Sequence, residues 1–149
     1  MAYDKLDWHS GGDFPAGLPE EAGATHIGMF LGWAILRGLE GELHRDESVE
    51  SLRSVRERRM TGREFFLKEC DAKFWEDDLS DTGNEFAQAY YAAEGEPSYL
   101  DDYVTVLAEG LPSEYHVEDS WGNFDKIATL LDKRFAEWKE GRLRPGSVQ

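Results

Sequence analysis

The stretch Ile27–Leu36, IGMFLGWAIL, decides the fold of this chain because nearly all its side chains are apolar. A helix that is apolar almost all round lies buried at the centre of a fold. The run is too short to span a membrane, which takes about 20 apolar residues. It therefore predicts a buried helix in a soluble protein, starting near Thr25 as a cap and ending near Gly38 in a left-handed conformation.

Two glycines inside this predicted helix stand four positions apart, at Gly28 and Gly32. Residues with that spacing lie on the same side of a helix. Because glycine has no side chain, the backbone of another element could approach this side closely. In a soluble chain we interpret the pair as a packing feature rather than as a dimer motif.

Two short motifs mark the starts of further helices. TGRE (Thr61–Glu64) and TGNE (Thr82–Glu85) each place glutamate three residues after threonine, which is the spacing of a capping box. The first predicts a helix that runs through Cys70, and the second predicts a helix that runs through Ala93.

The remaining patterns predict more helix and little strand. A narrow apolar stripe indicates an exposed helix over residues 46–59, and aromatic spacing indicates another over residues 99–107. Apolar residues recur every three or four positions from Phe124 to Trp138, which predicts the last helix. The alternation at Tyr115–Val117 is compatible with one short strand.

Together these elements predict a mainly α protein with one short β element at most. The length suits a single compact domain, residues 1–140, with five to six helices around the buried central helix. We expect residues 141–149 to form a flexible C-terminal tail.

The charge of the chain limits its partners. It carries 31 acidic and 16 basic residues, for a formal net charge of −15. Binding to nucleic acids or to anionic membranes depends on lysine and arginine, so neither is expected. The single cysteine excludes an intrachain disulfide and favours a reducing, cytoplasmic setting. A basic protein is the partner that this composition favours.

The acidic residues gather in the middle of the chain, where residues 64–119 hold 16 acidic side chains and two basic ones. Two segments there, residues 76–81 and 99–103, mix acids with apolar and aromatic residues. Charges of this kind steer an encounter, and aromatic side chains anchor the complex. The predicted contact residues are Glu76, Asp77, Asp78, Asp81, Asp101 and Asp102, with Tyr99 and Tyr103 as anchors.

A cluster of arginines from Arg53 to Arg63 contrasts with this acidity. An anion-binding patch is one interpretation. Because the whole chain is strongly acidic, we favour internal ion pairs between these arginines and the acidic middle segment.

Three residues near the N-terminus offer an enzymatic alternative. His9, Asp13 and His26 combine imidazole and carboxylate groups, which can bind zinc or act as general acids and bases. They would form a small metal-assisted hydrolase only if they converged. Their spacing matches no metal motif, so we expect no metal, no cofactor and a structural role in hydrogen bonds to loop backbone. Cys70, between two acidic residues, is expected to be buried and inert.

The motifs WHSGGDFP (Trp8–Pro15) and GATHIGMFLGWAI (Gly23–Ile35) carry a resemblance to known sequences. With shorter matches up to Trp138, the chain resembles a family of uncharacterised bacterial single-domain proteins. Members of this family are similar to the small proteins encoded beside polymorphic toxins. The resemblance implies an immunity role and no catalytic residues.

We therefore expect an immunity-type protein that neutralises a basic toxin by direct binding through its acidic surface. An immunity protein needs no active site, only a stable surface that is complementary to its toxin. A regulatory or scaffold module without a toxin partner is the third possibility.

Overall fold

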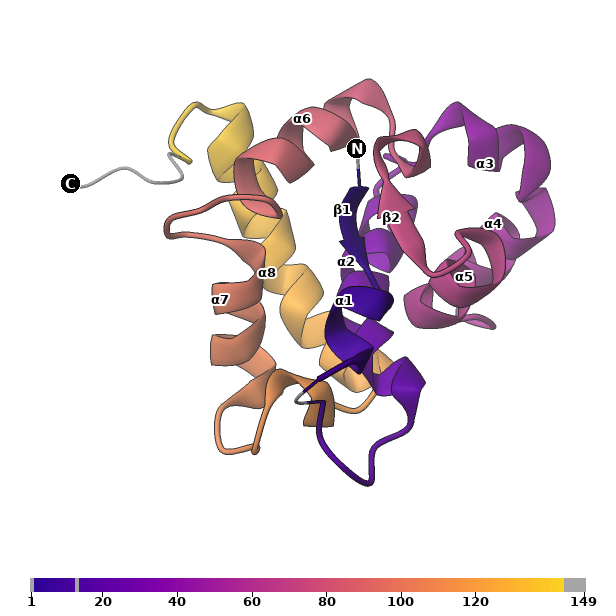
Figure 1. Ribbon diagram of the computed structural model, residues 1–149. Coiled ribbons are helices and arrows are strands. Elements are labelled where there is room, and N and C mark those ends of the chain that lie inside the picture. Colours follow the sequence, from indigo (N-terminus) through magenta and orange to yellow (C-terminus); the bar gives the residue numbers. More distant parts are fainter. Residues whose placement is uncertain (1, 13, 144–149) are drawn as a thin grey trace.

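A computed structural model describes residues 2–12 and 14–143 of the chain (Figure 1). Helix α2 (Thr25–Leu36) lies at the centre, and every residue from Thr25 to Ile35 is buried. This confirms the predicted mainly α fold around a buried central helix, although the described residues form eight α-helices where five to six were predicted. The surrounding elements are, in chain order, β1 (Ala2–Lys5), α1 (Asp7–Ser10), η1 (Glu20–Ala24), α3 (Glu42–Glu47), α4 (Val49–Arg56), α5 (Gly62–Glu69), β2 (Lys73–Trp75), η2 (Glu76–Asp78), α6 (Asp81–Tyr90), α7 (Tyr99–Tyr103), η3 (Val104–Ala108), η4 (Glu114–His116) and α8 (Trp121–Lys139).

Helices α2 and α5 cross at a contact between backbones, as the two glycines of α2 predicted. An added Cβ at Gly28 would collide with the backbone of Arg63. An added Cβ at Gly62, the first residue of α5, would collide with the carbonyl group of Gly28 and would lie 2.9 Å from Cα of Gly32. The crossing therefore depends on three glycines and has no room for a methyl group.

The N-terminal strand was not predicted. Strand β1 pairs with β2 in an antiparallel ladder, with Asp4 opposite Phe74 and Lys5 opposite Lys73. The short strand with which Tyr115–Val117 was compatible does not form, because Glu114–His116 is the 3-10 helix η4. The side chain of Ser113 caps that turn by accepting a hydrogen bond from the backbone of Tyr115.

One of the two predicted capping boxes is present, and the other is not. Thr61 and Glu64 form the complete capping box predicted for α5. The corresponding prediction for Thr82 is wrong, because α6 begins earlier and Ser80 caps it by accepting from the backbone of Gly83. Thr25 begins α2 but does not cap it, and its hydroxyl instead accepts from Arg63.

Helix α8 lies across α2 and completes the core with aromatic side chains. The Phe135 ring lies 5.6 Å from that of Trp33 and 5.2 Å from that of Phe86. The Trp33 indole also donates a hydrogen bond to Asp132 at 2.9 Å. Of the predicted C-terminal tail, Leu143 is buried, and residues 144–149 lie outside the described part.

In the described part of the chain, no helix combines the length and the apolar character needed to cross a membrane.

Candidate functional site

The residues predicted to contact a partner do not form one surface. Four of them are exposed, namely Glu76, Asp77, Asp81 and Asp101. The other four are half-buried or buried, namely Asp78, Tyr99, Asp102 and Tyr103.

The prediction that Tyr99 and Tyr103 anchor a partner is wrong. Both rings are buried in the core, and the Tyr99 hydroxyl donates a 2.6 Å hydrogen bond to the backbone carbonyl of His26. Helix α7 turns these rings toward α2, where Tyr99 packs 5.2 Å from Phe30. They stabilise the fold and are not available for binding.

Two of the predicted carboxylates are also used internally. Asp102 is half-buried, receives a hydrogen bond from Tyr90 and forms an ion pair with Arg134 at 2.8 Å. Asp78 exposes only 4% of its surface. The prediction that Asp78 contacts a partner therefore fails because its side chain is buried, whereas the contact predicted for half-buried Asp102 stays a prediction.

The exposed acids Glu76, Asp77 and Asp81 border a groove with a volume of about 710 Å³. The groove lies between the start of α3 and the turn from η2 to α6, and Glu42 adds a fourth exposed carboxylate. Among the described residues that line the groove, Arg45 is the one basic side chain, and it pairs with buried Glu40 at 3.4 Å. The groove is consequently strongly acidic.

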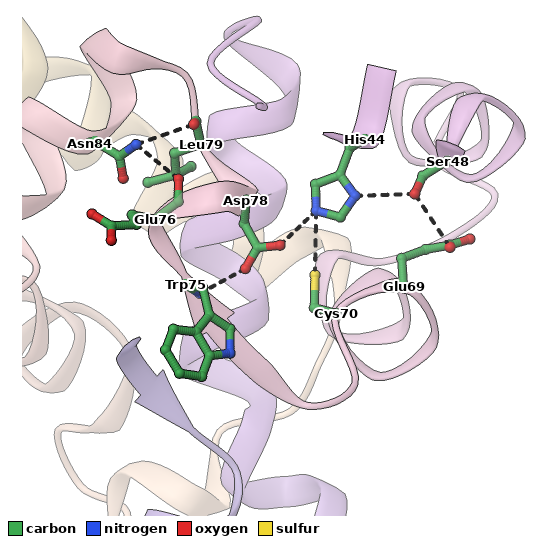
Figure 2. A network of polar contacts seen from close by, with 9 residues as sticks. All are labelled: His44, Ser48, Glu69, Cys70, Trp75, Glu76, Asp78, Leu79 and Asn84. Atoms are coloured by element: carbon green, nitrogen blue, oxygen red, sulfur yellow. Dashed lines mark hydrogen bonds and ion pairs between the residues drawn. The ribbon is translucent and has the colours of Figure 1, made fainter. Parts of the chain in front are cut away.

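Side-chain contacts of His44 and Asn84, which lie on opposite sides of the acidic turn η2, hold this turn in place (Figure 2). The Asp78 carboxylate lies 2.7 Å from Nε2 of His44. The side-chain amide of Asn84 donates to the carbonyl oxygens of Glu76 at 2.8 Å and Leu79 at 3.2 Å. The exposed carboxylates therefore project from a backbone that these hydrogen bonds hold in place.

Exposed apolar side chains lie at or beside this turn. Leu43 lines the groove with 44% of its surface exposed, and Trp75 immediately precedes η2 with 37% exposed. Trp8 is 60% exposed, and the Lys5 ammonium lies 5.6 Å from its ring and 5.2 Å from that of Trp75. These side chains, and not the buried tyrosines, are the exposed apolar groups of this surface.

The histidines of the enzymatic alternative do come together. The rings of His9 and His26 lie 4.5 Å apart. Asp13 lies outside the described residues. The carboxylate between the histidines comes from Asp4 on β1, 2.6 Å from Nε2 of His9 and 3.3 Å from Nε2 of His26. Sequence reasoning missed Asp4 because the pairing of β1 with β2 brings it there.

The contacts of Asp4 describe a tightly held anion. Besides the two histidines, the hydroxyl of Tyr91 donates to it at 2.6 Å and the backbone of Lys5 at 2.9 Å. Burial opposes ionisation of this carboxyl, but hydrogen bonds from His26 and His9 outweigh it and hold the pKa of Asp4 well below its usual range. The Asp4 side chain therefore links β1 and α1 to α2. The expected structural role of His9 and His26 is met by contacts with this carboxylate, whereas hydrogen bonds to loop backbone had been predicted.

The arginine cluster is engaged in internal ion pairs, as predicted. Arg53, Arg56, Arg58, Arg59 and Arg63 each lie within 4 Å of a carboxylate oxygen. The prediction that they pair with the acidic middle segment is wrong except for Arg63, which contacts Asp119. Arg58 instead reaches Asp125 of α8 at 2.6 Å. Of the acids that line the groove, buried Glu40 pairs with Arg56, whereas the ion pairs of these arginines in the described part of the chain do not involve Glu42, Asp77 or Asp81.

A second buried cluster joins His44, Cys70 and Asp78, and sequence reasoning missed it entirely. In the sequence His44 lies 26 residues from Cys70 and 34 from Asp78, so no spacing pattern relates them. Cys70 is buried, and its burial together with the neighbouring Asp78 raises the pKa of the thiol well above its usual range. Unless a metal ion replaces its proton, the Cys70 thiol therefore stays protonated. This agrees with the prediction that Cys70 is buried and inert.

The comparisons with known proteins identify one family. The model of the family described as a domain of unknown function (DUF7832) matches residues 2–117. The groove, the Asp4 cluster and the His44 cluster all lie inside this match. No curated protein and no solved structure matches the chain.

Proposed function

This chain belongs to the DUF7832 family of domains of unknown function, and we propose that it is an immunity-type protein that neutralises a basic bacterial toxin by direct binding. The occupant we infer for the groove is a lysine- or arginine-rich surface of that toxin. We further propose that the chain acts in the cytoplasm, where an immunity protein meets a delivered toxin.

The observation that carries this proposal is the acidic groove. Glu42, Glu76, Asp77 and Asp81 place four exposed carboxylates around it, and its one arginine is paired with Glu40. Carboxylates in a concave surface concentrate the negative potential and raise the association rate of a basic partner. Complementary charge thus supports a basic protein as the occupant.

The apolar side chains around the groove would supply binding affinity, which charge steering alone does not provide. Affinity in protein interfaces comes mostly from a few apolar or aromatic side chains that become fully buried. Leu43 and Trp75 are exposed beside the carboxylates, and the hydrogen bonds of Asp78 and Asn84 fix the backbone between them. A rigid acidic surface with two apolar anchors suits tight binding of a protein.

We favour binding over the hydrolase alternative because of the hydrogen bonds around Asp4. Four donors already surround the oxygens of this carboxylate, so a metal ion would have to displace several of them. A regulatory or scaffold module remains a distinct outcome of the following test.

The proposal is tested by expressing this chain together with each product of the genes that flank its own. An immunity protein restores growth to cells that express the toxic product and forms a stable complex with it in size-exclusion chromatography at low salt. If no flanking product is toxic, or if the toxic product neither binds the chain nor is neutralised by it, the proposal is wrong. Binding to a non-toxic flanking product would indicate a regulatory or scaffold module.

Charge reversal in the groove gives a sharper prediction. The double variant Asp77→Lys/Asp81→Lys should associate with the toxin about ten times more slowly at low salt, because steering depends on the local field. Its association rate should also depend less on salt. Stopped-flow or surface plasmon resonance measures both quantities.

The matched control carries the same change of net charge elsewhere. Glu94→Lys/Glu109→Lys alters two exposed acids that do not line the groove and are not among the predicted contact residues. Equal slowing by the two double variants would mean that net charge, and not the groove, guides the encounter. That result would move the interface away from the groove.

A further inference from the structure

Two acidic groups converge on a single nitrogen of His44 (Figure 2). Nε2 lies 2.7 Å from Oδ1 of Asp78 and 3.7 Å from Sγ of Cys70. An imidazole nitrogen carries either one hydrogen or one lone pair, so it makes one good hydrogen bond at a time. Hydrogen bonding at Nε2 therefore explains the position of only one of these two side chains.

The other nitrogen of His44 faces Ser48. Nδ1 lies 3.1 Å from the Ser48 hydroxyl, which also lies 3.3 Å from a carboxylate oxygen of Glu69. Either a proton on Nε2 or a metal ion bound by both atoms satisfies the 2.7 Å contact between Nε2 and Oδ1 of Asp78. A metal ion would also engage the sulfur of Cys70, which a proton leaves without a role.

We propose that His44, Cys70 and Asp78 bind a zinc ion. Imidazole nitrogen, thiolate sulfur and carboxylate oxygen are the ligands zinc takes in proteins. Zn–N bonds of about 2.0–2.1 Å and a Zn–S bond of about 2.3 Å imply a tetrahedral N–S separation of roughly 3.6 Å, close to the 3.7 Å between His44 and Cys70. Binding zinc would require the 2.7 Å between Nε2 of His44 and Oδ1 of Asp78 to widen to roughly 3.4 Å, the separation of two tetrahedral zinc ligands at about 2.0–2.1 Å.

The surroundings of the three ligands fit a metal site. Ligating histidines donate through their second nitrogen, and ligating carboxylates are themselves hydrogen-bonded. Here Ser48 is the partner of Nδ1, and the backbone N–H of Trp75 donates to Oδ2 of Asp78 at 2.8 Å. Oδ1 of Asp78 is thereby left for the ion, in a cluster whose three ligands are all buried.

The arrangement does not suit a nucleophilic cysteine. In a Cys–His–Asp triad the nucleophile and the carboxylate contact different ring nitrogens, so that the proton can be relayed. Cys70 and Asp78 both face Nε2 of His44. A zinc ion would replace the thiol proton and bind Sγ, Nε2 and Oδ1 together. Such an ion explains why Cys70 and Asp78 face the same nitrogen of His44.

A bound zinc ion would join three elements beneath the groove. His44 lies on α3, Asp78 on η2 and Cys70 directly after α5. The ion would hold the turn that carries Glu76 and Asp77 against α3. This inference concerns the isolated chain and does not depend on a toxin.

The test is metal analysis of the full chain, purified without a metal-affinity tag. We expect about one zinc per chain by elemental analysis. After chelation, added Co²⁺ should produce the near-ultraviolet absorption of a cobalt–thiolate bond. Added Zn²⁺ in large excess over its Kd should raise the Tm of the chelated protein by about 5–10 °C.

Variants separate this site from the Asp4 cluster. Cys70→Ser and His44→Gln should lose the cobalt–thiolate absorption and most of the zinc, whereas the control His9→Gln should keep both. The titrations of the wild-type chain remain decisive if a variant fails to fold. A folded, metal-free wild-type protein whose Tm ignores Zn²⁺ would overturn the proposal and leave a plain His44–Asp78 ion pair. Zinc retained by Cys70→Ser and lost by His9→Gln would overturn it in favour of the Asp4 cluster.

Discussion

Replacing Gly62 with alanine should lower the free energy of unfolding by about 4 kcal/mol or more, which is a large part of the stability of a domain this size. The added methyl group would collide with the carbonyl group of Gly28 and crowd Cα of Gly32. Backbone atoms cannot rotate away as a flexible side chain can, so α2 and α5 would have to separate. Thermal and urea unfolding followed by circular dichroism measure the loss.

Gly122→Ala is the matched control for this substitution. Gly122 also lies near the start of a helix, in α8, but an added Cβ there meets no atom within 4 Å. Alanine favours helix over glycine by up to about 1 kcal/mol, so this variant should be unchanged or slightly more stable. A Gly62→Ala protein as stable as Gly122→Ala would show that α2 and α5 are not in backbone contact.

Replacing Asp4 with asparagine should lower the free energy of unfolding by about 3 kcal/mol at neutral pH. Asparagine keeps the shape of the side chain but removes the charge that His9, His26 and Tyr91 surround. Removing one partner of a buried ionic network leaves the others unsatisfied, which commonly costs about 3–5 kcal/mol. Asp71→Asn, at a carboxylate whose side chain is 95% exposed, should cost little.

The cost of Asp4→Asn should also depend on pH. Because the pKa of folded Asp4 lies below its usual range, the folded state favours the ionised form. That stabilisation is complete above the unfolded pKa of about 3.9 and is lost as the pH falls toward the folded pKa. The stability difference between wild type and Asp4→Asn should therefore shrink between about pH 5 and pH 2. A difference that stays constant over this range would mean that the charge of Asp4 contributes nothing.

The sequence alone was enough to predict the centre of the fold. The apolar run from Ile27 to Leu36 predicted a buried helix, and Gly28 with Gly32 predicted a close backbone approach. Both features depend on local properties, namely how many sides of a helix are apolar and whether a Cβ is present. The capping box at Thr61 was predictable for the same reason.

The candidate sites depend on long-range contacts, which local patterns do not contain. The segment around Tyr99 and Tyr103 resembled an exposed acidic and aromatic surface, but α7 packs its rings into the core and leaves Asp101 outside. Asp4 meets His9 and His26 only because β1 pairs with β2. Short stretches of sequence therefore indicated which residues are acidic or aromatic but not which of them face the solvent.

The pairing of β1 with β2 also affects the order in which the protein can fold during synthesis. Asp4 leaves the ribosome about 70 residues before Phe74, its partner in the ladder. At roughly 5–20 residues per second, the first strand waits on the order of 4–14 s for the second. During this time the backbone groups of β1 are not paired with those of β2. Placement of Asp4 beside His9 and His26, which depends on this ladder, therefore comes after Phe74 has been made.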